Sequence, residues 1–322
     1  MEKEIHEIPA VIRRIAKEYR GFDFSAIRKL FAQNATIHIA ACGTSYHAGL
    51  MMAALLESHV KRRAKVYIAS EFPFLSPLVN QNDVGIVISQ SGETADTLAA
   101  MQTMQEYKMP IIAICNVAES SITRKANFSL LTHAGTEVAI ASTKAFVAQV
   151  LVAGLLTGYN SVDEFEEIAI EAEKILESAP EIKKIATRHK DSKRTFFLGK
   201  GLDAISALEA ALKVKETTYK HCEGYPSGEL KHGTLSLVDE NTLTISINTP
   251  DIVPERDKNK QAKLQNTITQ VRDRGSQLWL PAPIKSYALG TMPAQLFALY
   301  TSQALGLNPD QPRNLVKAVM VE

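Results

Sequence analysis

Short runs of apolar, β-branched residues alternate with helical segments along the first half of the chain, and this alternation constrains the fold most strongly. The runs have the length of buried strands and lie at residues 35–41, 65–69, 84–89, 110–115 and 128–132. Strands of this length that alternate with helices predict a parallel sheet with helices on both faces. Ligands of such α/β sheets bind beyond the carboxyl ends of the strands.

Residues 86–98 place a polar turn at such an end. The apolar run stops at Ser89-Gln90-Ser91-Gly92, and a helical pattern begins after Thr94. Strand, polar turn and helix N-terminus together favour phosphate binding, because free backbone N–H groups and the positive end of the helix dipole point at one place. The alternative is an ordinary capped turn without a ligand, in which Ser89 or Ser91 is the N-cap.

A second junction of the same kind follows the strand at 35–41, which ends at Cys42-Gly43-Thr44-Ser45 before an apolar helix. Two hydroxyl-rich turns at the carboxyl ends of two strands can converge on one ligand. A single capped turn does not account for the pair as well.

The second half of the chain repeats the pattern of the first. A strand at 195–198 ends in Gly199-Lys200-Gly201 and is followed by a helix over 204–219, and a later strand at 241–248 lacks the hydroxyl cluster. We therefore predict two similar α/β domains, at residues 1–178 and 179–322, with the phosphate turn only in the first.

The helix of the second domain carries Glu209, Lys213, Glu216 and Lys220, whose spacing of four, three and four residues puts them on one face. One interpretation is a solvated, salt-bridged surface. The other is a packed helix that carries chemistry, since its opposite face is apolar. For a sugar phosphate, a carboxylate could move a proton between carbons 1 and 2, a lysine could form an imine, and a histidine such as His232 could open the ring.

Composition narrows the class of partner. The formal net charge of +1 over 322 residues supplies no global field for nucleic acid or an anionic membrane. The three cysteines are far apart and show no metal-ligand spacing, and the chain shows neither a signal peptide nor a membrane-spanning run. We expect a cytoplasmic protein that uses no metal or cofactor.

Five motifs in order resemble the isomerase half of glucosamine-6-phosphate synthase, a tandem pair of sugar isomerase (SIS) domains. They are Cys42-Gly-Thr-Ser-Tyr-His47, Ser89-Gln-Ser-Gly-Glu-Thr-Ala-Asp-Thr-Leu98, Ala141-Ser-Thr-Lys-Ala-Phe146, Gly228-Glu-Leu-Lys-His-Gly233 and Asp310-Gln-Pro-Arg-Asn-Leu315. The resemblance runs from about Lys3 to Glu322. It implies an α/β fold in which each domain is a flavodoxin-like three-layer sandwich.

The resemblance also implies roles for individual residues. Glu216 matches the base that moves the proton, and Lys213 is its neighbour on the helix. His232 matches a ring-opening histidine supplied by the adjacent subunit, and Lys317 matches a lysine that forms an imine with the ketose. The residues implied to hold the sugar phosphate, or to lie close to it, are Thr44, Ser45, Ser89, Gln90, Ser91, Thr94 and Ser142. A homodimer with shared active sites follows if this arrangement is kept.

The chain begins where the isomerase half would begin, with Glu2 after Met1, whereas the synthase has an N-terminal glutaminase domain. This departure leads us to expect a glucosamine-6-phosphate deaminase, which would isomerise its substrate and release ammonia to give fructose 6-phosphate. The alternatives are a deglycase or isomerase of another phosphorylated ketosamine, the isomerase subunit of a split synthase, and a sugar-phosphate sensor.

Overall fold

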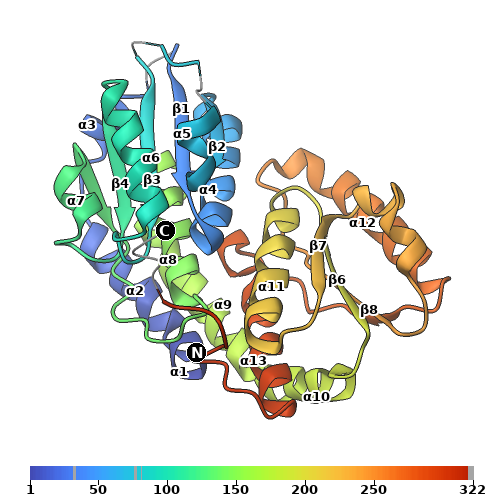
Figure 1. Ribbon diagram of the computed structural model, residues 1–322. Coiled ribbons are helices and arrows are strands. Elements are labelled where there is room, and N and C mark those ends of the chain that lie inside the picture. The colour runs from blue at the N-terminus through green and yellow to red at the C-terminus, as the bar shows by residue number, and fades with distance from the viewer. Residues whose placement is uncertain (32–33, 76–77, 81, 318–322) are drawn as a thin grey trace. The chain divides into compact units, whose positions relative to one another are not determined.

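The computed structural model describes residues 1–31, 34–75, 78–80 and 82–317, and Figure 1 shows its two parallel sheets. Contacts divide the chain into two compact units, which we name after their sheets. The five-stranded unit holds residues 10–137 and 144–167 and the tail from Val316, and the four-stranded unit holds residues 1–9, 138–143 and 168–315. Each unit thus combines separate stretches of sequence, and the domain boundary expected between residues 178 and 179 stays a prediction.

The sheet of the five-stranded unit is parallel throughout, in the order β2-β1-β3-β4-β5. Its strands are β1 (Thr36–Ala41), β2 (Arg63–Ile68), β3 (Val84–Ser89), β4 (Ile111–Cys115) and β5 (Phe128–Leu131). Its helices are α2 (Ile8–Tyr19, which begins in the other unit), α3 (Ser25–Arg28), α4 (Gly43–Leu55), α5 (Phe72–Leu75), α6 (Ala95–Glu106), α7 (Ser121–Lys125) and α8 (Lys144–Thr157). The parallel sheet expected from the alternating pattern is confirmed.

The strand order reverses direction between β1 and β3. The chain runs from β1 to β2 on one side and then returns to place β3 on the other side of β1, with Ala41 opposite Ile88 in the register. The segments that follow β1 and β3 therefore leave the same edge of the sheet side by side. Such a switch point is where parallel α/β sheets bind their ligands.

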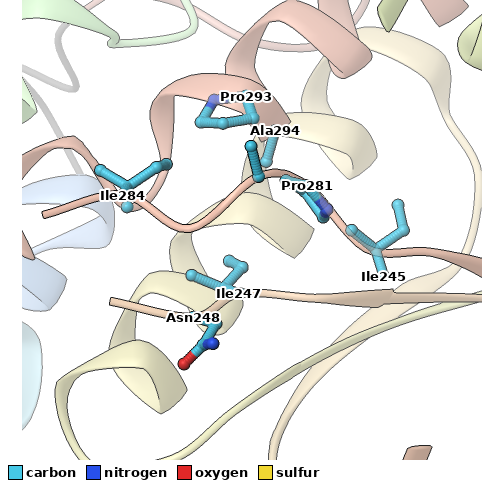
Figure 2. A pocket seen from close by; sticks show the side chains of 9 residues that line it. Ile245, Ile247, Asn248, Pro281, Ile284, Pro293 and Ala294 are labelled. Carbon is cyan, nitrogen blue, oxygen red and sulfur yellow. The ribbon is translucent and has the colours of Figure 1, made fainter. Parts of the chain in front are cut away.

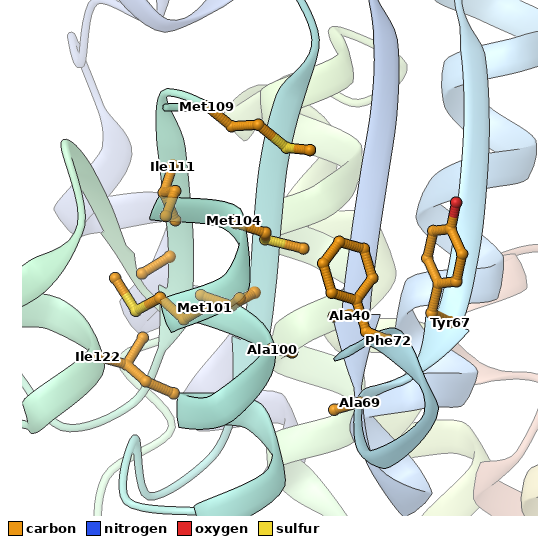
Figure 3. Packing of buried hydrophobic residues seen from close by; sticks show 12 residues of the cluster. Ala40, Tyr67, Ala69, Phe72, Ala100, Met101, Met104, Met109, Ile111 and Ile122 are labelled. Carbon is orange, nitrogen blue, oxygen red and sulfur yellow. The ribbon is translucent and has the colours of Figure 1, made fainter. Parts of the chain in front are cut away.

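Helices cover this sheet through apolar packing. Met101 and Met104 of α6 join Phe72 and Tyr67 in a buried cluster, which Figure 3 shows beside β1 and β2. The helix α8 packs on α4, and all its residues are buried. A helix that is apolar on every side belongs inside a protein, so any polar side chain it carries needs a specific partner.

The four-stranded unit repeats the same topology in the order β7-β6-β8-β9. Its strands are β6 (Arg194–Gly199), β7 (Cys222–Pro226), β8 (Thr242–Ser246) and β9 (Gln277–Trp279), all parallel. Its helices are α1 (Glu2–His6), α10 (Ala179–His189), α11 (Leu202–Thr218), α12 (Asp257–Arg272) and α13 (Met292–Ala304), while α9 (Phe165–Glu177) begins in the five-stranded unit.

The strand β7 is absent from the strands that the sequence pattern predicts for the second half of the chain. Cys222–Pro226 pairs with β6 at the edge of the sheet. The apolar pattern of the sequence does not reveal this strand, because its middle residues are polar or glycine. Its proline is tolerated because the strand lies at the edge of the sheet. Gly224 is required here, since a Cβ would lie 2.3 Å from the Ala207 carbonyl oxygen of α11.

In the part of the chain that the structure describes, no helix has both the length and the apolar character needed to cross a membrane.

Candidate functional site

The two hydroxyl-rich turns lie at the switch point of the five-stranded sheet. After β1, Thr44 and Ser45 occupy the first turn of α4, where Thr44 is half-buried and Ser45 is 8% exposed. After β3, the turn Gln90–Glu93 leads to Thr94, the N-cap of α6. Both helix N-termini therefore start from adjacent strands at one edge, which is the arrangement that favours an anion.

Side chains within the second turn hold its shape. The Ser89 hydroxyl oxygen accepts a hydrogen bond from the Gly92 N–H at 3.0 Å and lies 3.3 Å from the Thr94 hydroxyl oxygen. The Ser91 hydroxyl accepts from the Glu93 N–H at 3.2 Å, and the Gln90 carbonyl accepts from the Asn116 N–H at 3.2 Å. These bonds preform the turn, while Gln90 and Ser91 remain half-buried and partly accessible.

Neighbouring residues fix the centre of this turn. Gly92 has a φ of +70°, and a Cβ there would lie 2.1 Å from the Ser120 hydroxyl oxygen, so only glycine fits. The Glu93 carboxylate accepts from the Ser121 N–H at 2.7 Å, and this hydrogen bond lowers the pKa of Glu93. The first residues of α7 thus stabilise the turn that follows β3.

Gln149 is a residue that the sequence interpretation misses. It projects from the apolar helix α8, is 2% exposed, and its Nε2 donates to the Ser45 hydroxyl oxygen at 3.0 Å. Because the Ser45 oxygen accepts this bond, its hydroxyl hydrogen can be donated to an anion. The available signal was an amide inside an otherwise apolar helix.

Glu137 is a second missed residue, which precedes α8 in the chain and binds the N-terminus of that helix through its carboxylate. Its Oε1 accepts from the Ala145 N–H at 3.2 Å, and its Oε2 lies 2.7 Å from Nζ of Lys317. The Glu137 side chain is fully buried and that of Lys317 is 26% exposed. The structure therefore ties the tail lysine, implicated by resemblance, to the N-terminus of the helix that also contacts Ser45.

The four-stranded unit holds the charged residues expected on α11. Nζ of Lys213 lies 3.3 Å from Glu209 and 2.7 Å from Glu216, with side-chain exposures of 0% for Lys213, 0% for Glu209 and 19% for Glu216. This burial excludes the solvated-surface interpretation for these three residues. Lys220 does not join them, since it lies beyond the helix and donates to the Lys190 carbonyl.

Opposing effects act on the lysine of this cluster. Burial lowers the pKa of Lys213, but the charges of Glu209 and Glu216 outweigh burial and hold it well above its ordinary value. The lysine is therefore a fixed cation, held 2.7 Å from the carboxylate of Glu216, which is 19% exposed. A partly exposed carboxylate beside a buried cation has the geometry of a general base.

The remaining expected residues, His232 and Ser142, both belong to the four-stranded unit. His232 is exposed and follows the short 3₁₀ turn Glu229–Lys231 of the four-stranded unit. Ser142 is half-buried in the segment 138–143, which groups with the four-stranded unit rather than with the hydroxyl turns.

The switch point of the four-stranded sheet is filled by an internal ion pair. Asp203, near the start of α11, accepts from the Thr249 N–H at 3.0 Å and from its hydroxyl at 2.6 Å, and lies 2.7 Å from Nζ of Lys260. A protein carboxylate thus takes the donors that a bound anion would use. The expectation that the sequence after β8 has no phosphate turn stays a prediction.

An apolar pocket also lies in the four-stranded unit, between the end of β8 and the start of α13 (Figure 2). Its lining includes Ile245, Ile247, Pro281, Ile284 and Pro293. Its polar side chain, Asn248, exchanges two hydrogen bonds of 2.8 Å with Gln261. The lining therefore offers no acid or base. Among the described residues, no group of three or more histidine, cysteine or acidic side chains could hold a metal ion.

Comparisons with known proteins connect both sheets to one family. The profile of the SIS domain matches residues 29–157 and 190–276. Glutamine–fructose-6-phosphate aminotransferase [isomerizing] of Caldanaerobacter subterraneus is 37% identical, and the alignment covers 100% of this chain and 59% of that protein. The corresponding protein of Chlorobaculum tepidum is 38% identical, with 58% of its length covered. The chain thus spans about three fifths of the length of these curated relatives.

Solved structures agree with this assignment. The C-terminal domain of glucosamine-fructose-6-phosphate aminotransferase from Francisella tularensis has a TM-score of 0.83 and 31% identity, covering 97% of this chain and 98% of that one. Glucosamine-6-phosphate deaminase from Thermotoga maritima shares the fold, with a TM-score of 0.76 and 22% identity over 98% of this chain and 99% of that one. With a family match over both sheets and a common fold over nearly its full length, the chain belongs to the SIS domain family.

Proposed function

We propose that the protein is a phosphosugar isomerase that performs the reaction of the isomerase half of glucosamine-6-phosphate synthase. The observation that carries this proposal is the Glu209–Lys213–Glu216 cluster on α11, in which a buried lysine is paired with one buried and one partly exposed carboxylate. A binding protein or sensor has no need of a buried ion pair behind an accessible base.

In this proposal Glu216 transfers a proton between carbons 1 and 2. The carboxylate removes the proton from carbon 2 of an open-chain aldose, the electron pair of that C–H bond forms the C1–C2 double bond, and the carbonyl oxygen on carbon 1 takes a proton, which gives the enediol. The hydroxyl on carbon 2 then releases its proton and becomes the carbonyl, while the carboxyl group returns its proton to carbon 1, which gives the ketose. Atoms and charge balance without a cofactor.

The hydroxyl turns of the five-stranded unit would hold the phosphate of this substrate. Ser45, Ser89, Ser91 and Thr94 supply hydroxyl donors, Gln90 an amide, and the N-termini of α4 and α6 backbone N–H groups. Charge-assisted bonds of this kind are stronger than neutral ones and fix the orientation of a ligand. Thr44 and Ser142 are proposed to lie near the same group.

Lys317 and His232 would serve the steps before isomerisation. Lys317 is proposed to form an imine with a ketose, and His232 to open the sugar ring. The solvent exposure of His232 in a single chain is compatible with a role in the site of a second copy, as a shared-site homodimer requires.

The comparisons favour the isomerase half over the deaminase that the sequence interpretation put first. The relatives at 37% and 38% identity are named as isomerising aminotransferases, whereas the deaminase of Thermotoga maritima, at 22% identity, supports the fold alone. Deaminase activity is therefore an outcome for the assay to distinguish.

The test is to incubate purified protein separately with fructose 6-phosphate, with fructose 6-phosphate plus ammonium, and with glucosamine 6-phosphate. Products are separated by chromatography, and ammonia is measured enzymatically. We expect aldose 6-phosphate from fructose 6-phosphate, and incorporation of solvent deuterium at carbon 1 or 2. Ammonia release from glucosamine 6-phosphate would favour the deaminase, and the absence of turnover and of deuterium exchange in all three would overturn the proposal.

A further inference from the structure

The helix that carries Glu216 ends in an unusual way. Tyr219 follows the last residue of α11 with a φ of +59° and a ψ of 17°, in the left-handed region, and its N–H donates to the Lys215 carbonyl at 3.1 Å. Glycine and asparagine are the residues that commonly end helices in this conformation, because a Cβ is strained there. Among the described residues, Tyr219 is one of five non-glycine residues with a positive φ, and its side chain makes two specific contacts.

Both contacts are with the C-terminal tail. The Tyr219 hydroxyl oxygen accepts a hydrogen bond from the backbone N–H of Arg313 at 2.9 Å, and the Arg313 guanidinium carbon lies 4.2 Å from the centre of the Tyr219 ring. One residue of the tail thus binds both the polar end and the aromatic face of the same side chain. Both residues belong to the four-stranded unit, so this clasp is internal to it.

Further bonds hold the tail on the N-terminal side of the clasp. The Asp310 carbonyl accepts from the Ile140 N–H at 3.1 Å, and the Asp310 N–H donates to the Asn308 side chain at 3.0 Å. The clasp is the last of these anchors before the chain reaches Lys317. Along the sequence, Tyr219 lies three residues after Glu216, and Arg313 lies four residues before Lys317.

We propose that Tyr219 and Arg313 are positioning residues, which tie the tail to the end of α11 and so restrict the positions that Lys317 can reach during the reaction. This inference rests on the proposed function. Neither residue is assigned a contact with the substrate. Their effect is to restrict the tail, because a lysine four residues from a fixed point samples far fewer positions than one on a loose terminus.

Substitutions at Tyr219 and Arg313 distinguish a role in positioning the tail from a role in ending the helix α11. Tyr219→Gly keeps the left-handed helix end and relieves its strain, but removes the ring and the hydroxyl. Arg313→Ala removes the cation, and Arg313→Lys keeps the charge but loses the planar stack. Arg272→Ala, an exposed arginine on α12, is the matched control.

The readouts are kcat, KM, and the yield of the Lys317 adduct trapped by borohydride with fructose 6-phosphate, identified by mass spectrometry. Thermal unfolding in the presence of the sugar phosphate shows whether each variant folds and binds. We expect Tyr219→Gly and Arg313→Ala to lower both kcat and adduct yield by about tenfold or more, with little change in KM, because misplacement of a reacting group reduces rate rather than binding. Arg313→Lys should be intermediate, and Arg272→Ala should match the wild type.

The positioning role and the proposed function are contradicted by different results. If the wild type turns over but Tyr219→Gly and Arg313→Ala match it in kcat and adduct yield, the positioning role is wrong and the proposed function stands. If the wild type turns over no sugar phosphate and gives no adduct, the proposed function is wrong and the positioning role falls with it. An adduct that forms at another lysine would also overturn the positioning role.

Discussion

Nζ of Lys317 lies 2.7 Å from Oε2 of Glu137, whose side chain is fully buried. The two residues are 180 positions apart in the chain. The same carboxylate accepts from the Ala145 N–H, so the tail lysine and the N-terminus of α8 share one partner. In the proposed reaction this ion pair is the resting position of the lysine.

We predict that Glu137→Gln weakens the hold on Lys317. The amide keeps an oxygen for the Ala145 N–H but cannot form the ion pair, and a hydrogen bond to a charged group contributes about 1.5–3 kcal/mol. The yield of the borohydride-trapped Lys317 adduct should fall at least several-fold while the protein stays folded. Glu119→Gln, at an exposed glutamate, is the control. An unchanged adduct yield in Glu137→Gln would show that the pair does not prepare Lys317.

Removal of the buried cation of α11 should strongly destabilise the protein. Lys213→Met leaves Glu209 buried without its countercharge, and breaking a buried ion pair in this way costs about 3–5 kcal/mol. Urea unfolding measures the loss. Lys215→Met, two positions along the helix at an exposed lysine, should change stability by less than about 0.5 kcal/mol. The double variant Glu209→Gln/Lys213→Met should recover part of the loss, and full additivity of the two changes would contradict the proposed pairing.

The pH dependence follows from the raised pKa of Lys213. A group whose pKa is higher in the folded state contributes stability that is complete below the unfolded pKa, which is about 10.4 for lysine, and is lost as pH rises through the folded value. The stability contributed by this lysine should therefore be constant between about pH 6 and 9 and decline only in strong alkali. The comparison uses the double variant Glu209→Gln/Lys213→Met, which leaves no buried Glu209 carboxylate unpaired, and a difference in unfolding free energy from the wild type that varied between about pH 7 and 9 would contradict this.

Glu216→Gln should abolish turnover and leave binding largely intact. The amide keeps the shape of the side chain but cannot accept the proton, and Lys213 retains Glu209 as a partner. The rate of solvent deuterium exchange into the substrate should drop below detection. Stabilisation by sugar phosphate in thermal unfolding should persist. Loss of that stabilisation would instead point to a structural role for Glu216.

Ser91→Ala tests the hydroxyl turn after β3. The change removes a donor to the phosphate and the acceptor of the Glu93 N–H, so we expect phosphate-ester affinity to fall by about 1–3 kcal/mol. The effect should appear in KM and in titrations with a non-reactive sugar phosphate. Ser129→Ala, an exposed serine on β5, should match the wild type. The anchor assignment fails if Ser91→Ala has an unchanged KM.

Gln149→Met tests the orientation of the Ser45 hydroxyl. Methionine fills the space of glutamine inside α8 but cannot donate to the Ser45 oxygen, so the hydroxyl hydrogen can turn towards other acceptors. We expect KM for the sugar phosphate to rise by about fivefold to tenfold, close to the 1 kcal/mol of a typical hydrogen bond, with kcat nearly unchanged. A fall in kcat without a change in KM would assign Gln149 a different role.

Several features of this protein could be predicted from local patterns. The alternation of strands and helices predicts both parallel sheets, and the abrupt change at Ser89 locates a polar turn at a carboxyl end. The three-residue spacing of Lys213 and Glu216 places them on one helix face, as the 2.7 Å ion pair shows. Each of these features depends on residues that are close together in the sequence. The repeat of apolar and polar residues along a helix or a strand can be read directly from the sequence.

The strand β7 and the partners of the candidate site could not be predicted in this way. The middle residues of β7 are polar or glycine, and the segment becomes a strand because it pairs in parallel with β6. Gln149 looks like an isolated amide until α8 packs on α4 and brings it to Ser45, 104 residues away.

The sequence by itself therefore determined the α/β class, the position of the hydroxyl turns and the alignment of the charges on α11, because these follow from local periodicity. Only the tertiary structure decided that Lys213 and Glu209 are buried, that Glu137 holds Lys317, and that Tyr219 meets Arg313. The contacts of Glu137 with Lys317 and of Tyr219 with Arg313 join segments that are distant in sequence. Like the burial of Lys213 and Glu209, they depend on the packing of whole helices and strands, which no local pattern encodes.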